Sequence, residues 1–277
     1  MPKSWFLRAG LLTGLLFLYI PIALLIVLSF NDNRSVSVWS EFSFRWYGEL
    51  LRDDQLLSAA WLSVRVAFIS ASFAVVLGTM AGMMLARFGM FKGRALFSGM
   101  VSAPLVMPEV IMGLAMLLLF VSMEQMFGWP EGRGMLTIIL AHITFTMSFV
   151  TVVVQSRLVS MDASLEEAAM DLGARPAKVF FVITLPLIAP AIVSGWLLAF
   201  TLSLDDLVIT SFVSGPGSTT LPQVVFSSVR LGLSPKVNAL ATIVVAIVAL
   251  GILAAGFYNA RQEKQRRRDE QMAQQGS

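Results

Sequence analysis

The stretch MLTIILAHITFTMSFVTVVVQ, residues 135–155, decides the fold class, because no charged side chain interrupts it. An apolar run of about 20 residues is long enough to cross a lipid bilayer as one helix. Runs of similar character occur at 9–30, 62–86, 97–121, 187–213 and 237–259. Since backbone polar groups in lipid must pair within their own segment, the sequence predicts an all-α, polytopic membrane protein with six transmembrane helices.

The composition excludes several other classes of protein. Hydrophobic residues make up 57% of the 277 and charged residues 13%, whereas a soluble domain carries about 25% charged residues. Cysteine is absent and His142 is the single histidine, which excludes a disulfide framework, a catalytic cysteine and a Cys- or His-rich metal centre. No basic face has aromatic support, so we expect neither a metal site nor a nucleic-acid partner.

The distribution of basic residues sets the expected orientation. If the N-terminus is cytoplasmic, 13 of the 20 Lys and Arg residues lie in cytoplasmic segments and 6 lie in outside segments. Positive charge is enriched in cytoplasmic loops, so both termini are expected in the cytoplasm. The polar, basic tail 261–277 is expected to anchor the last helix at the lipid surface.

No pattern in the chain points to catalysis. The motif GxxxxGK[ST] is absent, which excludes ATP hydrolysis by that route. An intramembrane serine protease would need a serine in a strained glycine motif, and Ser214-Gly-Pro-Gly-Ser218 does not fit that pattern. A secondary carrier would be expected to show an inverted repeat, which is not evident. We therefore expect no catalytic residue, and we expect His142 to form a hydrogen bond between helices.

The connection SLEEAAMDLGARPAKVFFVITLP, residues 164–186, predicts a helix, a break and a second helix. Ser164 and Glu167 have the spacing of a capping box at the start of the first helix. Gly173 suits the left-handed residue that ends such a helix, and Pro176 suits the first turn of the next one.

The short helix in this connection has the features of a docking surface. Ala168 and Ala169 leave a smooth face that a partner surface can approach closely. Acidic Glu166, Glu167 and Asp171 flank that face, which is unusual for a loop that would otherwise face anionic lipid. The pattern therefore favours contact with another protein.

The same residues resemble the EAA signature of binding-protein-dependent ABC importer permeases: Glu167-Ala168-Ala169, then Gly173, then Ile183, Leu185 and Pro186. The resemblance implies a type I ABC importer permease fold. It also implies that about 162–186 forms a coupling loop, which docks into a cleft of a separate ATPase subunit. The coupling residues would be Glu166, Glu167, Ala168, Ala169, Asp171, Gly173, Ile183, Leu185 and Pro186. ATP and Mg would be bound by that partner, so no cofactor is expected in this chain.

Three carboxylates lie within the apolar runs, at Glu109, Asp205 and Asp206. A charge at the bilayer centre costs about 3 kcal/mol, so such residues usually face a cavity, a partner or a substrate path. Counted along continuous helices at about 1.5 Å per residue, all three lie in the outer half, with the two aspartates pointing about 100° apart. Acids there suit a cation such as a polyamine, whose ammonium groups they would bind. The alternatives are an ion pair with Arg65 and a hydrogen bond from Asp205 to a neighbouring helix.

Four further segments are similar to spermidine/putrescine importer permeases, with the second permease of putrescine importers as the nearest subgroup. They are Ala103–Val110, Phe200–Pro216, Ser234–Ala241, and the first outside loop with Ser29–Asn31 and Arg45–Leu50. The resemblance implies that Glu109, Asp205 and Asp206 line a polyamine path. It also implies that the loop 214–236 helps a periplasmic binding protein to dock. A permease for another cationic substrate, such as ferric iron or thiamine, is the alternative.

The assembly that these resemblances imply is a bacterial inner-membrane complex. Residues 1–277 would form a single permease domain beside a second, homologous permease chain. An ABC ATPase dimer would bind the cytoplasmic side, and a periplasmic polyamine-binding protein would deliver the substrate. Membrane lipid would surround both permeases.

Overall fold

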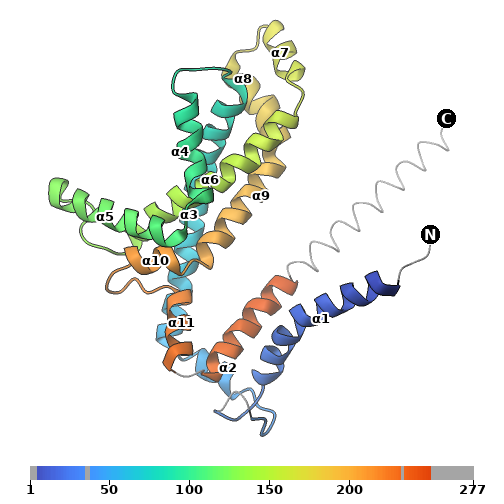
Figure 1. The fold of residues 1–277 in the computed structure, drawn as a ribbon, viewed down its shortest axis with the longest axis vertical. Coiled ribbons are helices and arrows are strands. Elements are labelled where there is room, and N and C mark those ends of the chain that lie inside the picture. The colour runs from blue at the N-terminus through green and yellow to red at the C-terminus, as the bar shows by residue number, and fades with distance from the viewer. Residues whose placement is uncertain (1–4, 35–37, 232–233, 251–277) are drawn as a thin grey trace. The chain divides into compact units, whose positions relative to one another are not determined.

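The computed structural model describes residues 5–34, 38–231 and 234–250, and Figure 1 shows its helical elements. They are α1 Trp5–Leu28, α2 Arg45–Leu50, α3 Asp54–Arg87, α4 Arg94–Val106, α5 Glu109–Phe127, α6 Met135–Ser160, α7 Ser164–Asp171, α8 Pro176–Val179, the π-helix η1 Phe180–Thr184, α9 Leu185–Leu204, α10 Val208–Val213, α11 Leu221–Leu231 and a helix over Pro235–Leu250. Within these residues the β-pairing is an isolated bridge between Asn31 and Phe42. The predicted all-α class is confirmed.

Five helical segments are long and apolar enough to cross a membrane: Leu7–Leu28, Asp54–Arg87, Glu109–Phe127, Met135–Ser160 and Pro176–Leu204. Two shorter apolar helices cover Arg94–Val106 and Pro235–Leu250. The last part of the expected run 237–259 and the tail 261–277 lie outside the described residues. The six-span count and the cytoplasmic termini stay predictions.

The chain forms two compact units, and the expectation of a single domain over 1–277 stays a prediction. The first unit comprises Met1–Asp54 and Ser227–Ser277, and the second comprises Gln55–Phe226. In the first, Phe30, Phe42 and Phe44 pack against one another. The Lys236 Nζ atom lies 3.1 Å from Asp53 Oδ2. Every predicted path and coupling residue lies in the second unit.

The core of the second unit packs α3 against α6 and α9. Ala71 and Ala74 of α3 contact Val150 and Val154 of α6, and Ile188 of α9 completes the cluster. A second cluster joins α3 and α6 to α5 and α10. Figure 1 shows α7 and α8 at one end of this unit and α10 towards the other. The bundle therefore separates the predicted coupling residues from the predicted path residues.

Gly78 permits the close approach of α3 and α6. A Cβ atom there would lie 2.8 Å from Val150 Cβ and 2.9 Å from Met147 O. We expect Gly78→Ala to destabilise the protein by about 1–3 kcal/mol through overpacking. The control is Gly99→Ala on α4, where a Cβ meets nothing within 4 Å and alanine favours the helix by about 1 kcal/mol. Thermal unfolding of the purified protein measures both, and equal melting temperatures would contradict the packing argument.

The run 97–121 is two helices instead of the continuous one expected from the sequence. α4 ends at Val106, Met107 is extended at φ −74°, ψ 137°, and α5 begins at Glu109. The reason is Pro108, because proline disfavours helical geometry in the residue before it. Figure 1 shows α5 leaving α4 at a steep angle. The expectation of one continuous helix through Glu109 is therefore wrong, and the depth of Glu109 in the membrane stays a prediction.

The run 187–213 is also interrupted. α9 ends at Leu204, and α10 begins at Val208. The Asp206 side chain accepts hydrogen bonds from the backbone N–H groups of Ile209 and Thr210, which starts a new helix. The expected 100° separation of Asp205 and Asp206 on one helix is therefore wrong, because both lie at the break.

Candidate coupling loop and carboxylate sites

The loop 162–186 has the predicted helix, break and helix. α7 ends at Asp171, and Gly173 follows in the left-handed region with φ +85°. The Gly173 and Ala174 N–H groups donate to Met170 and Ala169, which closes the last turn. Pro176 is the first residue of α8, as predicted.

The predicted capping box at Ser164 is wrong. Ser164 is already the first helical residue, and Ala163 precedes it as the N-cap. The Asp162 carboxylate takes over the capping role, because it accepts a hydrogen bond of 3.0 Å from the Ser164 N–H. This bond lowers the pKa of the Asp162 carboxyl.

α7 presents most of its predicted coupling residues outward. Glu167, Ala168 and Asp171 are exposed, and no residue of this helix is buried. The other half of the signature lies elsewhere: Ile183 is in η1, and Leu185 begins α9. Such an exposed helix has the accessibility that a docking surface requires.

Glu166 points inward instead. Its Oε2 atom lies 2.8 Å from Arg87 Nε at the end of α3, and the Thr184 hydroxyl donates to its Oε1 atom at 2.6 Å. Sequence reasoning missed both partners. Arg87 is far from this loop along the chain, and no local spacing pattern links the two.

Asp206 is buried in a hydrogen-bond network. Its Oδ2 atom accepts from the Thr210 hydroxyl at 2.6 Å and lies 3.1 Å from His142 Nε2. The His142 Nδ1 atom lies 2.6 Å from Ser203 Oγ. If Nε2 donates to the carboxylate, Nδ1 accepts from that hydroxyl, so a neutral imidazole satisfies every partner. The expectation that His142 links helices by a hydrogen bond is confirmed.

Asp205 and Glu109 are exposed, in contrast to Asp206. Among the described residues, no side chain pairs with the Asp205 or Glu109 carboxylates, and the alternative ion pair with Arg65 is not formed. Asp205 continues an exposed stripe of α9 that also carries Ser194 and Thr201. Residues at this spacing share one helix face, so the stripe is partly polar.

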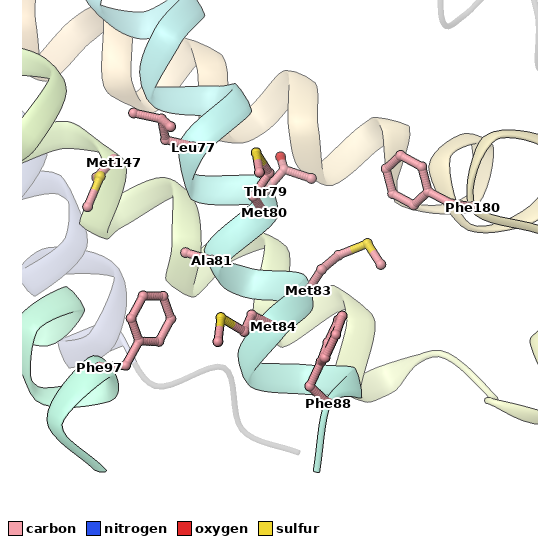
Figure 2. A pocket seen from close by; sticks show the side chains of 10 residues that line it. All are labelled: Leu77, Thr79, Met80, Ala81, Met83, Met84, Phe88, Phe97, Met147 and Phe180. Atoms are coloured by element: carbon pink, nitrogen blue, oxygen red, sulfur yellow. The ribbon is translucent and has the colours of Figure 1, made fainter. Parts of the chain in front are cut away.

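An apolar cavity of about 700 Å³ lies between α3, α4, α6 and η1, and Figure 2 shows the side chains that line it. Its lining residues are Leu77, Thr79, Met80, Ala81, Met83, Met84, Phe88, Phe97, Met147 and Phe180. No lining residue is charged, so this cavity does not suit an ammonium group. The carboxylates remain the candidates for cation binding.

The sequence is similar to known transport proteins over nearly its whole length. The family described as "Binding-protein-dependent transport system inner membrane component" matches residues 74–268. The putrescine transport system permease protein PotI of Escherichia coli K12 is 59% identical over 266 residues, covering 96% of this chain and 95% of PotI. The spermidine/putrescine transport system permease protein PotC of the same strain is 40% identical over 250 residues, covering 90% of this chain and 92% of PotC.

Solved structures share the fold at low sequence identity. A bacterial ABC transporter involved in alginate import matches with a TM-score of 0.69 at 17% identity, covering 91% of this chain and 94% of that chain. The MetNI methionine ABC transporter matches with a TM-score of 0.60 at 20% identity, covering 74% of this chain and 94% of that chain. The bacterial alginate transporter in complex with an alginate pentasaccharide-bound periplasmic protein matches with a TM-score of 0.68 at 18% identity, covering 91% of this chain and 92% of that chain. The predicted ABC permease fold is confirmed.

Proposed function

Because this chain belongs to the family of binding-protein-dependent transport system inner membrane components, we propose that it is a permease subunit of an ATP-driven importer of polyamines. It is a multi-pass inner-membrane protein, and its substrate is putrescine or spermidine. The observation that carries the proposal is the 59% identity to a putrescine permease over 96% of the chain. The exposed, unpaired carboxylate of Asp205 supports it, because that group suits a cationic substrate.

The proposed complex contains four kinds of component. A second, homologous permease completes the path, and a periplasmic binding protein delivers the polyamine. An ABC ATPase dimer binds ATP and Mg on the cytoplasmic side and supplies the hydrolysis. This chain performs no bond chemistry. The exposed surface of α7 around Glu167 and Ala168 supports docking to the ATPase, since a smooth, accessible helix face admits close contact.

The carboxylates take different roles in this proposal. Asp205 is an exposed path residue, and Glu109 at the start of α5 is a second one. Asp206 acts indirectly by holding the break between α9 and α10, because His142 and Thr210 occupy its Oδ2 atom and the Ile209 N–H donates to its Oδ1 atom. The polar stripe through Thr201 continues the path along α9.

Neutralising Asp205 should weaken uptake without unfolding the protein. A charge-assisted hydrogen bond contributes about 1.5–3 kcal/mol, so we expect Asp205→Asn to reduce putrescine uptake at low concentration about 10-fold or more. Uptake of radiolabelled putrescine by cells with matched protein levels measures the effect. Glu131→Gln, an exposed acid in the loop before α6, is the control. Unchanged uptake by Asp205→Asn would contradict its role in the path.

The substrate class is tested with the complete complex in nanodiscs. ATP hydrolysis should rise when the binding protein is loaded with putrescine or spermidine and should rise less with the empty binding protein. Stimulation by a thiamine- or iron-loaded binding protein, with no response to either polyamine, would favour the alternative substrate and overturn the proposal.

A further inference from the structure

We infer that the ion pair between Arg87 and Glu166 links α7 to α3, so that the cytoplasmic end of α3 follows α7 when that helix moves. The inference rests on the proposed function, in which α7 receives the movement of an ATPase. Arg87 and Glu166 are then positioning residues for the transport cycle. Neither needs to contact the ATPase or the substrate.

Glu166 joins three elements through its two carboxylate oxygens. One oxygen lies 2.8 Å from Arg87 Nε on α3, and the other accepts from the Thr184 hydroxyl on η1. Thr184 is buried, and the Arg87 and Glu166 side chains are only 19% and 13% exposed. A pair with so little exposure is screened weakly by salt. Its loss would leave one charge uncompensated.

The Arg87 contact depends on charge more than on hydrogen-bond geometry. The Nε and Nη2 atoms of Arg87 are buried and make no aligned hydrogen bond within the described residues. The Nε atom is nevertheless at ion-pair distance from the Glu166 carboxylate. Substitutions that reverse charge are therefore the sharpest probe of this link.

The last turns of α3, which lead to Arg87, border an unfilled apolar cavity. The cavity of about 700 Å³ lies between the last turns of α3 and Phe180 of η1, and Phe88 next to Arg87 lines it (Figure 2). Four methionines also line the cavity, and methionine side chains adapt easily to altered surroundings. The side of α3 that faces this cavity is therefore not held by tight packing, while the ion pair holds the end of the helix to α7.

Neighbouring Glu167 provides a built-in comparison. It lies on the same helix with the same charge, but it is exposed and no side chain in the described part of the chain pairs with it. Glu166 is thus set for a contact within the permease and Glu167 for a contact outside it. Reversing the charge of Arg87 should therefore disturb the contact of Glu166 and leave the contact of Glu167 unchanged.

The first experiment exchanges the charges in the complete complex. Arg87→Glu and Glu166→Arg should each reduce the ATPase stimulation by the loaded binding protein about 10-fold, with all subunits still assembled. The double variant Arg87→Glu/Glu166→Arg should recover at least half of the wild-type ATPase stimulation. The matched control Arg87→Glu/Glu167→Arg should recover none. Full stimulation in either single variant, or equal recovery in both double variants, would overturn the link.

The second experiment needs no substrate and so separates this inference from the proposed function. This chain contains no cysteine, so Phe88→Cys/Leu165→Cys places one thiol on the exposed residue next to each partner of the ion pair and leaves Arg87 and Glu166 in place. A bifunctional thiol reagent can then join the two thiols. If α3 follows α7, the cross-linking yield should be the same without nucleotide and after trapping with ATP and vanadate. A yield that falls several-fold on trapping would overturn the link. A wild-type complex that no polyamine-loaded protein stimulates would contradict only the proposed function.

Discussion

Glu167→Arg should abolish the stimulation of ATP hydrolysis by the loaded binding protein. Glu167 is exposed on α7 beside Ala168, at the centre of the proposed docking face. A reversed charge in an interface costs several kcal/mol, so we expect the affinity of the permease for the ATPase to fall at least about 100-fold. Because the side chain has no partner within the described chain, the fold of the permease should not change. Co-purification of the ATPase with the permease and ATPase assays in nanodiscs measure both effects.

The control for this prediction reverses an exposed acid far from α7. Glu131→Arg changes the net charge by the same amount in the loop before α6. It should leave both ATPase binding and stimulation at the wild-type level. A Glu167→Arg complex that assembles and responds fully would show that coupling does not pass through this face of α7.

The loop around α7 shows which features can be predicted from sequence. The roles of Gly173 and Pro176 depend on backbone constraints of those residue types, which act wherever the residues occur. The apolar runs predicted helices for a similar reason, since lipid permits no unpaired backbone groups. The capping box failed because Asp162, two residues earlier, offered a competing acceptor.

Tertiary interactions explain the other features of the structure that were not predicted from the sequence. The break before α10 requires Asp206 to fold back onto the next turn, and His142 on α6 stabilises that geometry. The partner of Glu166 is Arg87 on a different helix. Neither pairing has a signature in local spacing. The break at Pro108 could have been predicted, because proline restricts the conformation of the residue before it. The apolar character of the whole run 97–121 favoured a continuous helix instead.

Asp206→Ala should destabilise the protein strongly, whereas Asp205→Ala should not. Asp206 precedes Leu207, the N-cap of α10, and accepts hydrogen bonds from the backbone N–H groups of Ile209 and Thr210 in its first turn. Loss of such a capping interaction costs about 1 kcal/mol. The buried His142 also loses its acceptor, and an unsatisfied buried donor costs about 1–3 kcal/mol. We expect a total of about 3 kcal/mol, which lowers the melting temperature by about 6–12 °C.

Two comparisons isolate the cause of this loss. Asp205→Ala removes the same charge from the adjacent, exposed position, so its melting temperature should stay within about 1 °C of the wild type. In the His142→Phe background the donor is absent, so Asp206→Ala should cost less there than in the wild type. Thermal unfolding of all four variants in the same detergent measures the coupling. Equal shifts for the two aspartates, or fully additive losses with His142→Phe, would mean that the network does not hold the break between α9 and α10.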